Sequence, residues 1–537
     1  MKLATVVCLL SACSASGWAQ FQSVVDSPHN LSTSGPGVIR ATTEEQVCIF
    51  CHATHNSSPV RPLWNRAMPV DAYSVYTSRA LDAQPGQPTG SSKMCLSCHD
   101  GTIALGAVVS RTVPISMMGG VTTMPPGPGL IGTDLRDDHP ISFRYDSALA
   151  TQDSKLRLPS QLPPELHLDA NSELQCTTCH DAHNNARGNF LVMNNTNSQM
   201  CTSCHQMGTT AVSAHEDCAS CHQPHSAPSG PYLLRAATVA QTCLACHDGS
   251  VPGAPDIESS LSSAYIHETY SQVDPDEPYQ AHVSCADCHE PHTIGSGSSS
   301  APLIHPSFGE VPGVSASGAL LNAASYEYEV CFRCHAEGAT VEPHLPRRIV
   351  QNNTRQEFST SAISFHPVEG PGRNADVPSL LPGWTTSSVM YCTDCHSSDM
   401  GQQAGGNGPD GLHGSNQDPL LIARYSTADF TRESASAYEL CYSCHSRQSI
   451  LNDESFEEHE KHIVDERAPC SACHDAHGIS SLQGSSTGNS HLINFRTDIV
   501  FPDRRTGRLE FRDTGFRRGE CFLRCHGEDH SPEDYHP

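Results

Sequence analysis

The sequence predicts a chain of mostly coil and short α-helices, packed around a row of bound groups, with little or no β-sheet. Three observations predict this fold class. Only 37% of the 537 residues are apolar and 6% are aromatic, whereas globular proteins are roughly 45–50% apolar. The chain also has 26 Cys and 32 His. Most of the cysteines come in close pairs with a histidine directly behind them, so groups bound there would occupy the interior that side chains leave unfilled.

Eleven segments read C-x-x-C-H, and a twelfth reads C-x-x-x-C-H. Their paired cysteines are Cys48 and Cys51, Cys95 and Cys98, Cys176 and Cys179, Cys201 and Cys204, Cys218 and Cys221, Cys243 and Cys246, Cys285 and Cys288, Cys331 and Cys334, Cys392 and Cys395, Cys441 and Cys444, Cys470 and Cys473, and Cys521 and Cys525. The histidines that follow the second cysteines are His52, His99, His180, His205, His222, His247, His289, His335, His396, His445, His474 and His526.

C-x-x-C-H is the attachment motif of c-type haem. Its two thiols bond to the porphyrin vinyl groups, and the adjacent histidine becomes the proximal ligand of the iron. Zinc ribbons and redox motifs also use C-x-x-C, but neither needs a histidine directly after each pair. The sequence therefore predicts a multihaem cytochrome c with twelve haem c groups and, outside the N-terminal segment that holds Cys8 and Cys13, no cysteine left for a disulfide. The extra residue in the twelfth motif leaves an alternative there, a cysteine pair without haem.

The motifs follow one another as six pairs, and their first cysteines are 25 to 51 residues apart within a pair. In five pairs the first motif continues to C-x-x-C-H-x-x-H, which adds His55, His183, His225, His292 and His477; the fifth pair reads CHSSDM instead. This alternation indicates a repeated two-haem module. We expect a signal peptide at 1–19 and six modules at 20–150, 151–210, 211–260, 261–350, 351–455 and 456–537.

The supply of histidine predicts two axial histidines at most irons. Twelve proximal histidines leave 20 of the 32, and the 11 methionines, the other common distal ligand, occupy no repeated position. The distal candidates are the five C-x-x-C-H-x-x-H histidines, the upstream residues His29, His139, His215, His282, His366 and His462, His413 in a Gly-rich loop of the fifth module, and His491 and His530, which compete for places in the last. We expect surface positions for His167, His267, His305, His344, His459 and His536.

The first motifs of several pairs read CHQPH, CHEPH or CHDAH, and His-Pro segments precede two modules at His139-Pro140 and His366-Pro367. With the SHLINF segment before the last motif, these features resemble the doubled-CxxCH multihaem cytochromes of metal-respiring bacteria. The resemblance covers nearly all of the chain after the signal peptide. It implies electron transfer in the periplasm, at the outer membrane or outside the cell, by a carrier, a conduit component or a filament subunit.

Two classes of function are compatible with this pattern. A six-coordinate iron has no open position, so a row of such haems would conduct and store electrons without catalysing a reaction. The alternative is a reductase or oxidase of a small nitrogen or sulfur oxyanion, which needs one haem with an open distal face. Because every motif keeps its histidine and distal candidates exceed the need, we predict an electron-transfer protein, not an enzyme, with no catalytic residues. Its partners would be other cytochromes, an outer-membrane conduit or further copies of the chain.

The N-terminus and the charge balance predict export and exclude one class of partner. Met1-Lys2, the apolar run Leu3 to Ala12 and the small residues before Ala19 indicate a signal peptide; a lipoprotein signal ending at Cys13 is the alternative. The net charge of −27 excludes nucleic acid, which requires a basic surface. No later apolar run reaches the roughly 18–20 residues of a membrane-spanning helix.

Overall fold

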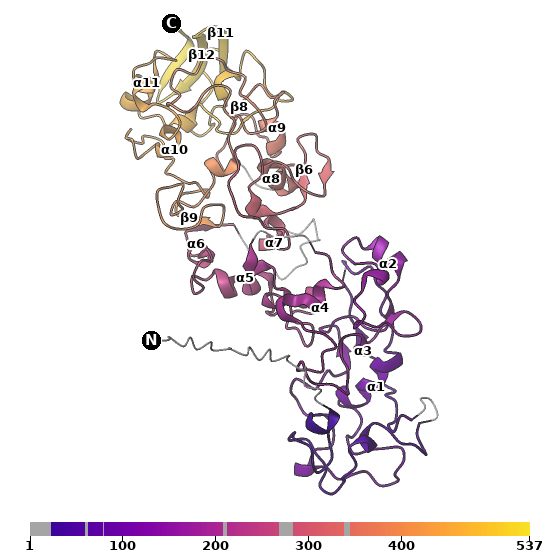
Figure 1. Ribbon diagram of the computed structural model, residues 1–537. Helices are drawn as coiled ribbons and strands as arrows, with labels where there is room; N and C mark the ends of the chain where they lie inside the picture. The colour runs from indigo at the N-terminus through magenta and orange to yellow at the C-terminus, as the bar shows by residue number, and fades with distance from the viewer. Residues whose placement is uncertain are drawn as a thin grey trace, which may run out of the picture. The chain divides into compact units, whose positions relative to one another are not determined.

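The computed structural model describes residues 23–58, 63–78, 80–207, 212–267, 283–337 and 344–536. Helices account for 22% and strands for 14% of it, and the rest is turn and coil (Figure 1). The predicted fold class, mostly coil with short helices and little sheet, is confirmed. The predicted signal peptide, with Cys13 and Ala19, lies outside the described residues, and so does the distal candidate His282.

The α-helices have four to ten residues. They are α1 (Gly90–His99), α2 (Ser147–Gln152), α3 (Cys176–Cys179), α4 (Gln199–Thr202), α5 (Val239–His247), α6 (Ile257–Ser260), α7 (Cys285–Cys288), α8 (Glu327–His335), α9 (Thr354–Phe358), α10 (Glu439–Tyr442) and α11 (Arg447–Leu451). In the part of the chain that the structure describes, no helix is long and apolar enough to cross a bilayer.

In the part of the chain that the structure describes, ten of the thirteen strands have two residues each, and they form five two-stranded sheets. These pairs are β1 (Ser74–Val75) with β2 (Asp134–Leu135), β3 (Phe143–Arg144) with β4 (Glu173–Leu174), β5 (Tyr265–Ile266) with β9 (Gly414–Ser415), β6 (Gly313–Val314) with β7 (Leu320–Leu321), and β8 (Ser364–Phe365) with β10 (Gly478–Ile479). Only the first pair is parallel.

A helical turn forms on each of the eleven C-x-x-C-H motifs. Seven lie in α1, α3, α4, α5, α7, α8 and α10, and the other four begin with the 3₁₀ turns Cys48–Phe50, Cys218–Ser220, Cys392–Asp394 and Cys470–Ala472. The amide of the motif histidine donates to the carbonyl of the first cysteine, as in His52 to Cys48 (2.7 Å) and His474 to Cys470 (3.0 Å). This i→i−4 bond folds the motif into one turn, so both cysteines and the histidine come from a single compact segment.

The chain divides into two compact units. The first unit, Met1–Met207 with Asp217–Ala236, contains α1 to α4 and β1 to β4. Its largest apolar cluster has only six buried residues, among them Phe50 and Leu105. Arg66 lies beside this cluster with no exposed surface, and its guanidinium donates to the carbonyls of Ser97 (2.8 Å) and Leu105 (2.8 Å).

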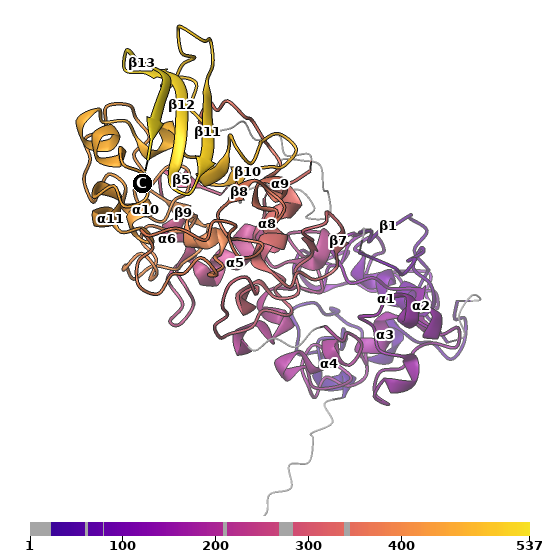
Figure 2. The same cartoon turned by 90° about the horizontal axis from the view of Figure 1, so that it is seen from above.

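The second unit, Gly208–Glu216 with Ala237–Pro537, contains the remaining helices and strands. It ends in an antiparallel three-stranded sheet of β11 (Glu510–Gly515), β12 (Arg518–Cys525) and β13 (Glu528–Tyr535), drawn in yellow in Figure 2. One face of this sheet packs on a cluster of eight buried residues that includes Phe511, Leu523 and Tyr535. Apolar side chains are thus buried in several small clusters.

Candidate haem sites

The 24 described cysteines are all free, without a disulfide in the described part of the chain. In the first five predicted modules, the first cysteine of the second motif lies beside the first cysteine of the following motif, close enough for the two thiols to affect each other's pKa. This holds for Cys95 with Cys176, Cys201 with Cys218, Cys243 with Cys285, Cys331 with Cys392, and Cys441 with Cys470. The last motif of one predicted module therefore touches the first motif of the next.

In five of the predicted modules, the second cysteine of the first motif lies beside a cysteine of the second motif. Burial, and then the charge of a nearby thiol, raises the pKa of Cys51 to about 12, and the nearby thiol is that of Cys98. The same causes raise the pKa of Cys395 to about 12 beside Cys444. Burial and a neighbouring cysteine thiol also raise the pKa to about 12 at three further second cysteines. These are Cys179 beside Cys204, Cys288 beside Cys331, and Cys473 beside Cys521. Within each unit, the cysteine pairs follow one another in space in the order of the chain.

Ten motif histidines face a second histidine at nearly constant separation. The ring centroids are 6.1 to 6.4 Å apart in every case. The pairs, motif histidine first, are His52 with His183, His99 with His29, His180 with His225, His205 with His139, His247 with His215, His289 with His413, His335 with His267, His396 with His477, His445 with His366, and His474 with His459.

This separation is the one that a shared metal ion requires. A metal–imidazole bond is about 2 Å, and each ring centre lies roughly 1 Å beyond its nitrogen, so two histidines on one iron have centroids about 6 Å apart. Rings in direct contact stack closer, as His29 and Phe190 do at 4.1 Å. Among the described residues, no group of three or more His, Cys, Asp or Glu could hold a metal ion. The histidines lie in pairs. Two axial ligands are what haem iron takes from the protein, whereas a structural zinc ion takes four.

The pairs follow a rule along the chain. Each second motif in the first five modules faces a histidine upstream of its module's first motif, as His99 faces His29 and His445 faces His366. Three first motifs instead face the C-x-x-C-H-x-x-H histidine of the next module: His52 faces His183, His180 faces His225, and His396 faces His477. His413, expected to serve the fifth module, faces His289 of the fourth and so replaces the histidine missing from CHSSDM.

Backbone carbonyls hold the motif histidines in one tautomer. The Nδ1 atoms of His99, His180 and His289 donate to the carbonyls of Gly129 (2.6 Å), Asn189 (2.8 Å) and Ser307 (2.8 Å). A proton on Nδ1 leaves the Nε2 lone pair free for a metal. Burial lowers the pKa of His396, His445 and His474 to about 4, so these rings are neutral, as a ligand must be.

At some distal candidates a carboxylate replaces the carbonyl, and Nδ1 of His292 donates to Glu290 at 2.7 Å. Asp138 accepts from Nδ1 of His225 at 2.9 Å, and Asp138 is itself only 4% exposed. Glu357 lies 3.3 Å from Nδ1 of His477. Burial lowers the pKa of His477, but the Glu357 carboxylate outweighs this and raises it. A carboxylate in this position makes the imidazole a stronger electron donor to a bound metal.

Not every candidate faces a motif histidine. His55 is exposed, and no ring contact to another histidine is found for it in the described part. The exposed His491 lies 3.5 Å from Asp513. Two residues expected at the surface, His267 and His459, face His335 and His474. The surplus of histidine in the last module, where His459 precedes His462 by three residues, is the signal that could have indicated the second of these.

The twelfth motif differs from the others. Cys521 and Cys525 lie on strand β12 instead of on a helical turn. Nε2 of His526 binds Asp429 at 2.9 Å, and Phe430 stacks on its ring at 4.5 Å. His462 and His530, neither of which belongs to a motif, face each other at 6.2 Å.

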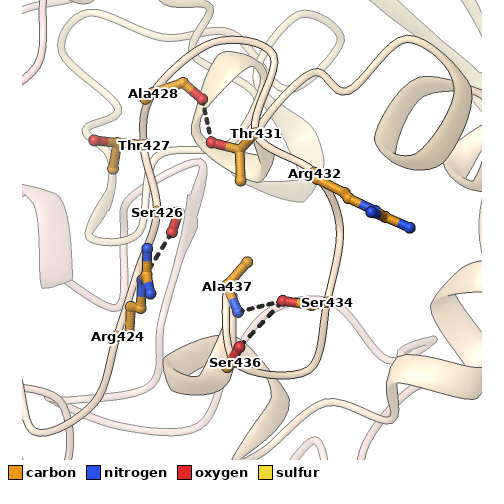
Figure 3. Close-up of a pocket in the computed structure, with 9 residues that line it drawn as sticks. All are labelled: Arg424, Ser426, Thr427, Ala428, Thr431, Arg432, Ser434, Ser436 and Ala437. Atoms are coloured by element: carbon orange, nitrogen blue, oxygen red, sulfur yellow. Dashed lines mark hydrogen bonds between the residues drawn. The ribbon is translucent and has the colours of Figure 1, made fainter.

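One pocket of about 390 Å³ lies in the loop of residues 424–437 (Figure 3). Hydroxyl and guanidinium groups line it: Ser426, Thr431 and Ser434 point toward it, and Arg424 closes one side through a bond to Ser426. Neither cysteine nor histidine lines this pocket. Ala437, which lines the pocket, belongs to the apolar cluster against which Cys441 and Cys470 pack, and Asp429 and Phe430 belong to the same loop.

Comparison with known proteins agrees with the geometry. Residues 316–485 match the family model described as outer membrane cytochrome MtrC/MtrF-like, domains II/IV. Residues 167–209 and 211–251 each match the doubled CXXCH motif family, and each match contains one pair of motifs. No curated protein matches the chain.

The cysteine pairs lie on helical turns, and paired histidines are separated by the distance that one shared metal ion requires. These features define a c-type cytochrome that binds several haems. The chain is a multihaem c-type cytochrome, and its matched segments are similar to the doubled-CxxCH and outer membrane cytochrome families. The resemblance predicted from the motifs is thereby confirmed.

Proposed function

We propose that the protein is an exported dodecahaem cytochrome that conducts and stores electrons through closely spaced haems, nearly all with two axial histidines. The observation that carries the proposal is the set of ten facing histidine pairs at 6.1 to 6.4 Å. We assign the motif histidine of each pair as the proximal ligand and the other as the distal ligand. The axial partner of His222 stays a prediction.

Haem supplies a one-electron redox couple when bound. The side chains of this chain control access to the iron and orient its ligands. A histidine on each face excludes substrate and water from the iron. Burial lowers the pKa of His396, His445 and His474 and keeps these imidazoles neutral. Carbonyls at Nδ1, as at His99, His180 and His289, fix the orientation of the rings. Because the ligands are held before and after electron transfer, little rearrangement opposes the change of charge.

The order of the cysteine pairs supports conduction. Neighbouring motifs share thiol contacts, such as Cys95 with Cys176 and Cys441 with Cys470, so the attached porphyrins would lie edge to edge or face to face. Electrons could then pass from haem to haem in the order of the motifs within each unit. A first-motif iron held by the next module's histidine also ties successive modules together.

The similarity of residues 316–485 to outer membrane cytochromes supports a location at or beyond the outer membrane. We propose other cytochromes of a conduit as redox partners, with self-assembly as a second mode. The net charge of −27 favours partner surfaces with positive charge. The proposal includes no enzymatic activity.

Haem quantitation and carbon monoxide test the proposal. The purified protein should carry twelve haems by mass and by pyridine haemochrome, and its dithionite-reduced spectrum should not change with CO. A CO shift on one haem would instead reveal an open iron and support the oxyanion reductase or oxidase. A mass that corresponds to eleven haems would indicate that Cys521 and Cys525 bind none.

A further inference from the structure

The twelfth motif forms a β-hairpin where the other eleven form a helical turn. Cys525 pairs with Glu528, so His526 and Gly527 are the two residues of the turn. Both have positive φ, 49° and 94°, the combination that a two-residue hairpin turn requires. The extra residue between the cysteines favours this extended form, because a helical turn could no longer return the histidine to the first cysteine.

His526 is held in a way that no other motif histidine shares among the contacts described. Its Nε2, the nitrogen that stays free at motif histidines whose Nδ1 binds a carbonyl, binds the Asp429 carboxylate at 2.9 Å. Its Nδ1 is buried without a hydrogen bond, although the Glu466 carboxylate lies 3.7 Å away. Phe430 covers the ring face at 4.5 Å. The nitrogen that would bind iron is therefore already occupied.

His530 is placed where a ligand from this motif would be needed. It is paired with Leu523 across β12 and β13, so the two side chains share one face of the sheet. Leu523 belongs to the apolar cluster against which Cys521 and Cys525 also pack. His530 and both cysteines of the motif therefore lie on the inward side of the sheet.

His462 faces His530 at 6.2 Å with an interplanar angle of 29°. Nδ1 of His462 donates to the carbonyl of Glu458 at 2.6 Å, which leaves its Nε2 free, as at the other facing pairs. His462 is also the upstream histidine of its module. In the five preceding modules the upstream histidine faces the second motif, and His462 continues that rule with His530 in place of the motif histidine.

We propose that His462 and His530 are the axial ligands of the haem attached at Cys521 and Cys525, and that His526 binds Asp429 and no iron. The inference rests on the proposed function in one respect, a haem at this motif. It assigns a proximal ligand five residues beyond the second cysteine, and it explains how a motif with an extra residue keeps two histidines on its iron.

The variant His530→Ala of the haem-loaded protein distinguishes the two arrangements. If His530 is a ligand, the reduced variant should bind about one equivalent of CO per chain while its mass still corresponds to twelve haems. His491→Ala, which removes an exposed histidine of the same module, should bind none. A twelve-haem His530→Ala protein that does not respond to CO would overturn the assignment.

Two further variants give independent readouts. His530→Met should move one haem to a higher reduction potential in a spectroelectrochemical titration, because a methionine ligand raises the potential; unchanged potentials would contradict the proposal. His526→Asn keeps a donor for Asp429 and should leave the reduced spectrum insensitive to CO; a new CO-binding haem would show that His526 is a ligand. A wild-type mass that corresponds to eleven haems would show that no haem is attached at Cys521 and Cys525. This outcome would count against the twelve-haem proposal, whereas the CO results test the ligand assignment.

Discussion

Replacing His183 tests whether a histidine of one module holds the iron of the module before it. His183 faces His52 at 6.1 Å with nearly parallel rings, whereas His55, the equivalent residue of the first module, is exposed. His183→Ala should open one iron, so about one haem in twelve becomes able to bind CO. His55→Ala is the matched control and should open none.

The same substitution should lower stability. A shared iron would close the loop from residue 52 to residue 183, and the chain-entropy estimate for a cross-link over about 130 residues is at most about 5 kcal/mol. At roughly 2–4 °C per kcal/mol for a unit of this size, the midpoint of thermal unfolding should fall by up to about 10–20 °C. CO titration and a thermal melt followed at the Soret band measure both effects. Equal behaviour of His183→Ala and His55→Ala would refute the ligand rule.

Three other substitutions have defined outcomes. Asp138→Asn removes the carboxylate 2.9 Å from Nδ1 of His225. Loss of this charge-assisted hydrogen bond, worth about 1–2 kcal/mol, should raise the reduction potential of one haem by about 40–80 mV. A redox titration that shows unchanged potentials would contradict this. Arg66→Gln should lower the free energy of unfolding by about 2–4 kcal/mol, and with it the thermal midpoint, because Arg66 is fully buried and donates to several carbonyls. The substitution of an exposed arginine, Arg136→Gln, is the control. Burial raises the pKa of Glu369 to about 7. The folded state therefore favours the protonated carboxyl, and the free energy of unfolding falls as the pH rises and the carboxyl ionises. Native stability should therefore decline between pH 4.5 and 7, and Glu369→Gln should be more stable than wild type by about 1 kcal/mol at pH 8, after allowance for partial exposure, with no gain at pH 4.

The fold class could be predicted from the sequence because the motif is itself a local structure. C-x-x-C-H closes one helical turn through a bond four residues back, and low apolar content excludes a large side-chain core. The C-terminal sheet was not predicted as an element. Its signal was local: one added residue in Cys521–His526 and a His-Gly pair suited to a hairpin turn.

The distal candidates could be selected by type but not paired from the sequence. His183 and His225 follow one motif and face another in the module before, because successive modules pack through their cysteine pairs. His267 had no motif to distinguish it from surface residues, since only the fold brings it to His335. Pairings of this kind depend on contacts between distant segments, and local spacing carries no record of them.

An experimental structure of the haem-loaded protein, with iron located by anomalous scattering, tests the central claim most directly. The account predicts an iron between the two rings of each of the ten facing pairs, such as His52 with His183 and His289 with His413. It predicts a further iron between His462 and His530. Irons that meet other residues on their distal faces, or an open distal face at any of these pairs, would contradict it.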